Sequence, residues 1–201
     1  MTSQVKASTR EMRRRQTRER VLGAAIAEFR RAGMAGADVN AIAAAAGVAH
    51  GTFFFHFPSK EHVLFELEGR EEALLAAEFA RFLEEPHDLV SVLTELVHSV
   101  TGLERRLGPI LFKELLALHF SPTRPHKDDW TDHPVIVLLV AEIERARNDG
   151  VVHPEVDAFY SAMFFLLGIY GVLTTTDNTE TRDTMLAKLV DTAVRGLGKE
   201  V

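Results

Sequence analysis

Hydrophobic residues recur every three or four positions along most of the chain, which is the spacing of one face of an α-helix. No segment shows convincing alternation of apolar and polar residues, so no β-strand is predicted. The first helix is expected between about Thr17 and Ala32, where Gly33 ends it. Its apolar stripe consists of Val21, Leu22, Ala25, Ile26 and Phe29. The pattern predicts an all-α fold with about nine helices in total.

Prolines, glycines and capping residues divide the rest of the chain into further helices. Pro109 and Pro134 each fit the first position of a helix, where the missing N–H has no intrahelical partner to lose. Asp177-x-x-Glu180 precedes the last predicted helix. The expected helices cover residues 59–82, a segment starting at 88, 110–120, 134–147, 154–174 and a last segment ending near 195.

Residues 38–57, DVNAIAAAAGVAHGTFFFHF, predict two short helices around a tight turn. Asp38 fits an N-cap, and Gly47 fits a helix stop that needs left-handed φ. Small alanine side chains let two helices cross closely, as in a helix-turn-helix, which places its second helix in the DNA major groove. Phe53 and Phe57 are expected to anchor the small core. An αα-corner in any helical domain has the same pattern, so this segment alone leaves both interpretations open.

Charge is distributed unevenly along the chain. Residues 1–60 hold ten lysines and arginines against four acids, a net charge of +6. Residues 61–201 hold 13 basic and 25 acidic residues, a net charge of −12. A basic N-terminal part on an acidic body is typical of a protein that binds a polyanion at one end only.

The stretch from Thr17 to Leu67 resembles the N-terminal domain of the TetR family of bacterial transcriptional regulators. The matching motifs are TRERVL…A…FRRAG in the first helix, IA-x-AAGV-x-x-GT across the turn, and FPSKE before the next helix. The resemblance implies a three-helix DNA-binding domain with a basic N-terminal arm over residues 1–58. A helical ligand-binding and dimerisation domain would follow over residues 59–201, which match the family only in length and helical layout.

The resemblance also implies a set of DNA contacts. Ala49 to His56 would form the recognition helix, and Lys60 matches a common phosphate contact. The segment from Arg10 to Arg18 is either a solvated charged helix face or an arm that touches phosphates or the minor groove, and the two interpretations weigh evenly. The predicted DNA-binding residues are Arg13, Arg14, Arg15, Arg18, Asn40, Ala49, His50, Gly51, Thr52, Phe54, His56 and Lys60.

Three residues depart from the family pattern. Ala49 stands where a capping Ser or Thr is usual, and such a cap contributes ~1 kcal/mol. His50 stands where Lys or Arg is frequent, and Phe54 replaces a tyrosine whose hydroxyl often bonds phosphate. Since imidazoles titrate near neutral pH, His50 and His56 predict operator affinity that rises as the pH falls from about 8 to 6.

The segment from Phe159 to Leu173 is apolar on almost every face. A membrane span needs ~20 apolar residues, and these fifteen include two glycines, so no membrane partner is predicted. A helix that is apolar all round must be covered all round, and in similar proteins this helix and the last one form a four-helix dimer interface. The predicted interface residues are Phe159, Phe165, Ile169, Leu186, Leu189, Val190, Ala193, Val194 and Leu197.

The remaining helices resemble the ligand-binding region of the family. For any single apolar residue in them a core role is commoner than a pocket role. Together they predict an apolar or amphipathic effector, oriented by the polar tips of His119, Trp130 and Tyr170. The candidate lining residues are Phe79, Leu93, Val97, Leu103, Phe112, Leu116, His119, Phe120, Trp130, Leu138, Met163, Phe164, Leu167 and Tyr170.

Several function classes find no support in the sequence. The chain has no cysteine, which excludes disulfides and cysteine catalysis and suits a reducing cytoplasm. No glycine-rich phosphate loop or hydrolase motif occurs. His119, His126 and His133 stand seven residues apart, but prolines interrupt any common helix face. Neither an enzyme nor a cofactor or metal site is therefore predicted.

The features combine into one predicted function. We expect a cytoplasmic homodimer that binds double-stranded DNA at a palindromic operator, most simply a repressor that an apolar or amphipathic small molecule releases. An activator with the same fold is the first alternative. A helical protein-interaction module is a weaker one, because it leaves the basic N-terminal part without a purpose.

Overall fold

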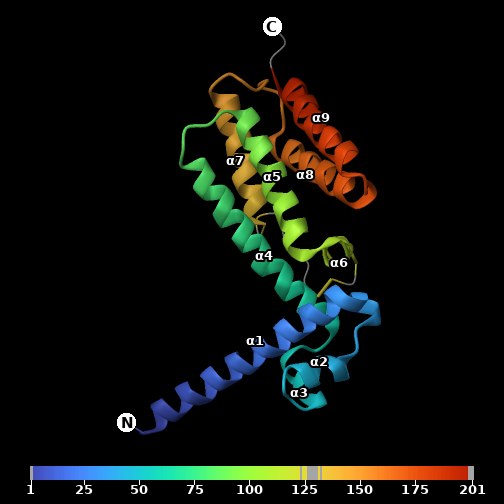
Figure 1. The fold of residues 1–201 in the computed structure, drawn as a ribbon. Helices are drawn as coiled ribbons and strands as arrows, with labels where there is room; N and C mark the ends of the chain where they lie inside the picture. Colours follow the sequence, from blue (N-terminus) through green and yellow to red (C-terminus); the bar gives the residue numbers. More distant parts are fainter. Residues whose placement is uncertain (1, 123, 126–130, 132, 199–201) are drawn as a thin grey trace. The chain divides into compact units, whose positions relative to one another are not determined.

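A computed structural model describes residues 2–122, 124–125, 131 and 133–198 (Figure 1). These residues form nine helices, and their only β contact is an isolated bridge between Val152 and Gly198. The prediction of an all-α fold is confirmed. The helices are α1 (Thr2–Gly36), α2 (Val39–Ala45), α3 (His50–His56), α4 (Lys60–Leu83), α5 (Leu89–Leu107), α6 (Pro109–His119), α7 (Pro134–Asn148), α8 (Ala158–Thr175) and α9 (Thr179–Leu197).

The chain divides into two compact units. The first comprises Met1–Glu68 and Leu107–Pro125, and the second comprises Gly69–Arg106 and His126–Val201. Beyond the predicted DNA-binding domain of residues 1–58, the first unit also includes the start of α4 and α6, which packs against α1. Both carboxylate oxygens of Glu114 on α6 accept the backbone N–H of Met34, at 2.7 and 2.8 Å.

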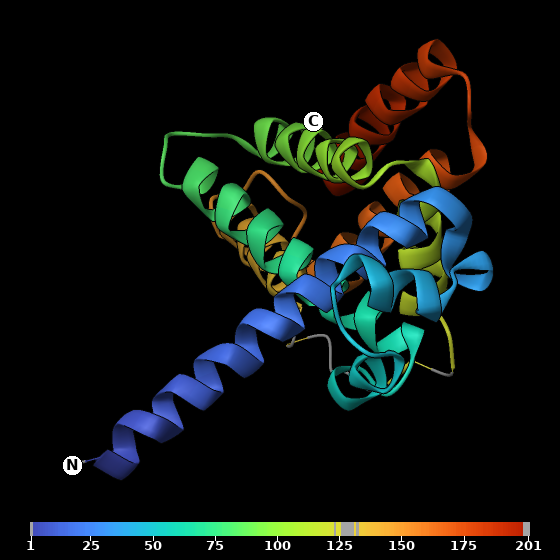
Figure 2. The same cartoon turned by 60° about the horizontal axis from the view of Figure 1, so that its bottom comes forward.

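In the first unit, α1 is much longer than predicted. It begins at Thr2 instead of near Thr17, and its N-terminal half runs beyond α2 and α3 (Figures 1 and 2). The predicted stop at Gly33 is a kink with φ 71°, a conformation that glycine adopts without strain, and the helix continues to Gly36. Four residues of the predicted apolar stripe are buried, namely Val21, Leu22, Ala25 and Phe29.

In the second unit, α8 packs against both α7 and α9. A Cβ at Gly168 of α8 would lie 2.9 Å from Cδ1 of Leu189 on α9, so the close approach of these helices depends on glycine. The prediction that Pro154 opens this helix is wrong. The helix begins at Ala158 because the carboxylate of Asp157 accepts the backbone N–H of Tyr160 and caps it.

Helix α8 has 18 residues and is therefore longer than the apolar segment read from the sequence. Among the described helices it is the one long and apolar enough to cross a membrane, by length and composition. A core helix passes the same test, and this one buries one of its faces within its own unit. The buried residues are Ala158, Ala162, Phe165, Leu166, Ile169 and Leu173.

Candidate nucleic-acid interface

Helices α2 and α3 form the predicted helix-turn-helix. The carboxylate of Asp38 accepts the backbone N–H of Asn40 at 2.8 Å and caps α2. Gly47 has φ 65° in the turn, and the next amide, of Val48, donates to the carbonyl of Ala43 at 3.0 Å. The cap and the turn are thus formed by the residues that the sequence assigned to them.

The aromatic residues of α3 divide between its two faces. Phe53 and Phe57 are fully buried, which confirms that they anchor the core of the first unit. Phe54 and Phe55 are 46% and 67% exposed. Ala49 precedes the helix without a side-chain cap, as expected. The exposed face of α3 therefore presents aromatic rings beside His50 and Gly51, which are also exposed.

An open groove of about 890 Å³ lies between the N-terminal half of α1 and α3. We call it the arm groove. Its only carboxylate, Glu11, pairs with Arg15 at 3.1 Å, so the lining carries excess positive charge. The guanidinium of Arg14 lies 5.3 Å from the ring centre of Phe55, within the range of a cation–π contact. The lining residues are Arg10, Glu11, Arg13, Arg14, Arg15, Thr17, Arg18, Thr52, Phe55 and His56.

Arg18, predicted to contact DNA, holds the first unit together. Its guanidinium donates to the backbone carbonyl of His56 at 2.5 Å and forms an ion pair with Glu66. The same group lies 4.2 Å from the ring centre of Phe57. With both ends of the guanidinium engaged, we assign Arg18 chiefly to positioning α3.

Lys60, predicted to contact a phosphate, also has protein partners. Its ammonium donates to the carbonyl of Met34 at 2.5 Å and to the carbonyls of Ala35 and Ala37 at 3.3 Å. These acceptors belong to the C-terminal end of α1 and the residues after it, where helix carbonyls lack partners and the helix dipole favours a cation. In this structure Lys60 caps α1.

His56 is buried, with 8% of its surface exposed, so its predicted contact with DNA is corrected to a packing role. Burial lowers the pKa of His56, and the guanidiniums of Arg18 and Arg14 lower this pKa further. Both effects disfavour the charged imidazolium that a phosphate contact would need. Of the two histidines that carried the predicted pH dependence, His50 remains on the surface.

Sequence reasoning missed Phe55, which lines the arm groove and is the most exposed phenylalanine of α3. A signal was available in the helical spacing. With Phe53 and Phe57 on one face at i and i+4, residue 55 falls on the opposite face of the helix. The predictions for Asn40, Gly51 and Thr52 stay predictions.

Comparison with known proteins identifies the chain. Residues 21–67 match the family described as bacterial regulatory proteins, tetR family. Over 161 residues the chain is 26% identical to the HTH-type transcriptional regulator UidR of Escherichia coli (strain K12), covering 78% of this chain and 80% of UidR. The chain belongs to the TetR family.

Solved structures agree with this assignment. Thermus thermophilus FadR, a TetR family transcriptional repressor in complex with lauroyl-CoA, is 27% identical, with a TM-score of 0.67 over 92% of this chain and 97% of that one. FadR from Bacillus halodurans, a fatty acid degradation regulator, is 22% identical, with a TM-score of 0.64 over 89% and 92% of the two chains, and shows the shared fold. As a TetR family member, the chain is a DNA-binding transcriptional regulator, which confirms the predicted function class.

The predicted pocket residues of this TetR family protein fall in both units. Phe112, Leu116, His119 and Phe120 belong to the first, and Trp130 lies outside the described residues. The others belong to the second unit. The buried candidates are Phe79, Leu93, Leu103, Phe112 and Leu116, the partly buried ones are Val97, His119, Leu138, Met163 and Tyr170, and the exposed ones are Phe120, Phe164 and Leu167.

His119, expected to orient a ligand, uses its Nδ1 within the first unit. This atom lies 2.5 Å from Oε1 of Glu68, and Arg124 donates to the same oxygen at 3.0 Å. Glu68 is buried, and a buried carboxylate needs such partners. His119 and Arg124 therefore fix the end of α6 and the residues after it to α4.

The predicted dimer residues are mostly core residues of the second unit. Five of them are buried in the protomer, where a second chain cannot reach them in this conformation: Phe165, Ile169, Leu186, Val190 and Leu197. Phe159, Leu189, Ala193 and Val194 are partly buried. The accessible apolar face of α8 instead carries Tyr160, Phe164 and Leu167, which are 57%, 66% and 40% exposed. We call these three the α8 face.

Tyr160, Phe164 and Leu167 stand at i, i+4 and i+7, so they lie on one side of α8. The rings of Tyr160 and Phe164 stack with centroids 6.2 Å apart. Beside them an apolar groove of about 250 Å³ includes Phe164 of α8 and Leu189 of α9 in its lining. The sequence did not show which side of this apolar helix faces its own core.

Proposed function

We propose that the chain is a homodimeric repressor, located in the cytoplasm, that leaves a palindromic operator when it binds an amphipathic small molecule. The observation that carries the proposal is the arm groove. It combines the exposed arginines of α1 with the exposed face of α3, within one compact unit. Phosphates attract such a surface from any DNA sequence, and α3 supplies the contacts to base edges.

On the DNA side, three residues of the arm carry the phosphate contacts, namely Arg13, Arg14 and Arg15, which are all exposed. His50 and Thr52 lie at the start of α3, the part of a recognition helix that approaches base edges. Phe55 supplies an apolar surface between the two sets. Arg18 and Lys60 hold this arrangement in place from behind.

On the protein side, a second copy of this chain covers the α8 face. TetR family regulators bind DNA as dimers. A two-fold dimer presents its recognition helices to successive major grooves, about 34–36 Å apart. The α8 face supplies adjacent exposed aromatic and aliphatic side chains, which suit the centre of such an interface. The same burial satisfies the apolar outer side of α8 without a membrane.

The effector is proposed from two lines of support. The second unit contains many buried apolar residues, the kind of lining that an acyl or similar chain contacts. Thermus thermophilus FadR, at 27% identity, is solved in complex with lauroyl-CoA. We therefore propose an effector that joins an apolar chain to a polar head.

Release from DNA is proposed to act as a population shift between two states of the dimer. Helix α6 is fixed to the DNA-binding part through Glu114 and Met34 and through His119 and Glu68. A ligand that favours one position of α6 is thereby coupled to the ends of α1 and α4. A difference of a few kcal/mol in ligand affinity between the two states is enough for most of the switching.

The test uses the full chain and DNA from upstream of its own gene. We expect a dimer by light scattering, binding to that fragment in preference to a scrambled one, and release by lauroyl-CoA. A monomer that binds no duplex DNA at low salt would contradict the proposal. Binding to a site that increases transcription would favour the activator alternative. No catalytic activity is proposed, since the relatives are transcriptional regulators.

A further inference from the structure

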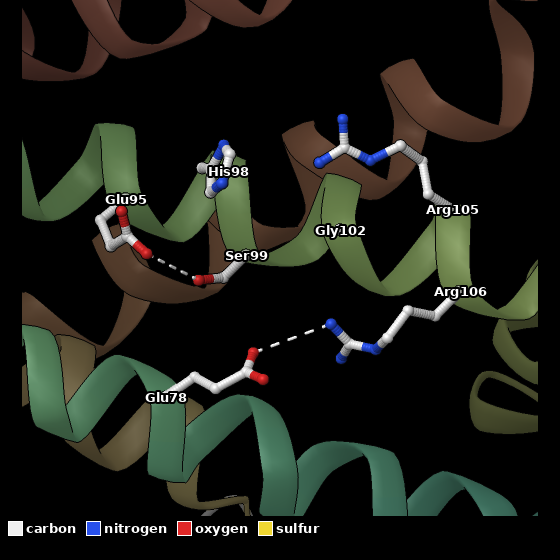
Figure 3. A pocket seen from close by; sticks show the side chains of 7 residues that line it. All are labelled: Glu78, Glu95, His98, Ser99, Gly102, Arg105 and Arg106. Carbon is white, nitrogen blue, oxygen red and sulfur yellow. Dashed lines mark hydrogen bonds and ion pairs between the residues drawn. The ribbon is translucent and has the colours of Figure 1, made fainter.

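A polar cleft of about 560 Å³ runs along α5 in the second unit (Figure 3). We call it the α5 cleft. One of its lining residues, Glu78, comes from α4, and the others come from α5. The lining residues are Glu78, Glu95, His98, Ser99, Gly102, Arg105 and Arg106. Neither the apolar pocket prediction nor the DNA interface includes any of them.

Both carboxylates of the cleft already have partners. Glu78 lies 3.7 Å from the guanidinium of Arg106, which also lies 3.6 Å from Glu71. Glu95 accepts a hydrogen bond from the hydroxyl of Ser99 at 3.2 Å. Figure 3 shows both contacts, with the Glu78–Arg106 pair bridging α4 and α5. The Glu78 charge is balanced in place, and the Glu95 carboxylate is directed toward Ser99.

The other two charged or titratable groups have no such partner. Within the described part of the chain, neither His98 nor Arg105 makes a hydrogen bond or an ion pair, and both are exposed. Exposed arginines elsewhere in this unit differ, since Arg145 pairs with Glu142 and Arg195 pairs with Asp191.

The helix geometry directs these two groups to a common place. His98 and Arg105 are two turns apart on one face of α5, a rise of about 10.5 Å at the standard pitch. Gly102 lies between them and leaves that face without a side chain. Helical side chains lean toward the N-terminus, and Figure 3 shows the guanidinium of Arg105 extending back over Gly102 toward His98.

We propose that the α5 cleft binds the phosphate-bearing head of the amphipathic effector, with Arg105 and His98 as the donors. The inference rests on the proposed function and adds the class of the polar head. A guanidinium binds a phosphate through two parallel hydrogen bonds, and an imidazole N–H adds a third donor. Residues 61–201 carry a net negative charge, so an arginine there without an acidic partner, such as Arg105, favours an anionic ligand. A nucleotide-containing thioester and a phospholipid-like molecule share this chemistry.

The test compares three probes by calorimetry on the full chain. Lauroyl-CoA and dodecyl phosphate carry phosphate, whereas the thioester of lauric acid with N-acetylcysteamine is a neutral analogue. We expect Arg105→Ala to weaken both phosphate probes tenfold or more, at about 1.4 kcal/mol per factor of ten, and to leave the neutral probe unchanged. His98→Gln should act in the same direction. Arg145→Ala, which removes a charge outside the cleft, is the control and should change nothing.

The outcomes separate this inference from the proposed function. Equal affinity of wild-type protein and Arg105→Ala for lauroyl-CoA and dodecyl phosphate would overturn the α5 cleft as the head-group site. If the neutral thioester releases the protein from operator DNA, and Arg105→Ala does not change this release, the proposed function is supported independently of the α5 cleft. The affinities for the two phosphate probes then decide whether the cleft binds the head group. Tighter binding of lauroyl-CoA than of dodecyl phosphate, lost in Arg105→Ala, supports a nucleotide-containing head, and the reverse order supports a lipid-like phosphate.

Discussion

The ammonium of Lys60 lies 2.5 Å from the carbonyl oxygen of Met34, whose own amide donates to Glu114. The last turn of α1 is therefore held from two sides, by α4 through a cation and by α6 through a carboxylate. The family resemblance connects Lys60 with DNA phosphates, but here Lys60 joins the start of α4 to the C-terminal end of α1. The difference has measurable consequences.

Replacing Lys60 with methionine tests which role dominates. The variant keeps most of the side-chain volume and loses the donor to three carbonyls, so we expect the free energy of unfolding to fall by about 1–2 kcal/mol. Urea denaturation measures this loss. The slope of log affinity against log salt should stay unchanged, because no phosphate contact is removed. Unchanged stability together with a slope smaller by about 0.9 would instead show that Lys60 binds DNA.

The arginines of the arm should give the opposite result. Arg13→Ala/Arg14→Ala removes two exposed charges, so we expect a salt slope smaller by about 1.8 and weaker binding to operator and scrambled DNA alike. Stability should change by less than about 0.5 kcal/mol, as for most exposed sites. Arg195→Ala, an exposed arginine on α9, is the control. An unchanged slope in the double variant would show that the arm is a solvated helix face.

His56 links folding to pH in a defined direction. Burial lowers its pKa below the ordinary value of 6.5, so the unfolded chain binds the proton more readily than the folded one. Its contribution to stability is therefore present above pH 6.5 and is lost as the pH falls through 6.5 toward the folded pKa. We expect His56→Gln to flatten the stability profile between pH 7.5 and 5.5, measured by urea denaturation. An equally steep profile in that variant would contradict the assignment.

The two histidines of α3 allow a direct test of the predicted pH dependence of DNA binding. A rise in operator affinity as the pH falls from about 8 to 6 needs an imidazole that can gain charge beside a phosphate. His50 is exposed on α3, whereas His56 is buried. We expect His50→Gln to remove the rise and His56→Gln to keep it in titrations at matched ionic strength. A rise that survives in His50→Gln would place the titrating group elsewhere.

Local patterns in the sequence predicted the structural features that depend on residues close together in the chain. The cap at Asp38 and the turn at Gly47 depend on neighbours within a few residues, and the helical spacing of Phe53 and Phe57 marks the face they share. The roles of Arg18 and Lys60 depend on partners 38, 48 and 26 residues away. Charge alone marked both as candidates for DNA. Only the fold shows which basic side chains already have a protein partner.

A similar limit applies to α8. The sequence shows that Phe164 and Phe165 are equally apolar neighbours, but not which one faces the interior. The structure buries Phe165 and leaves 66% of Phe164 exposed. Gly168 lies on the side of α8 that meets α9, where it allows the close contact with Leu189. The apolar surface left for a partner therefore follows from packing that the sequence pattern does not specify.

Phe164→Asp tests whether the α8 face pairs two copies of the chain. Because Phe164 is mostly exposed, the change removes little burial from the protomer, and we expect unchanged helicity and a similar unfolding midpoint. In a two-fold interface the substitution occurs twice, so dimer affinity should fall at least about 100-fold. Analytical ultracentrifugation should then show a monomer at micromolar concentration. Operator affinity should fall with it, since paired half-site contacts are lost.

The matched control for this prediction is Val151→Asp, which places the same charge on another exposed apolar residue of the second unit. That variant should remain a dimer with wild-type operator affinity. If Phe164→Asp stays dimeric and binds the operator normally, the α8 face is not the interface. If both variants dissociate, added charge anywhere on this unit weakens the dimer, and the specific assignment of the α8 face fails. Dissociation of Phe164→Asp alone identifies the surface that joins the two copies.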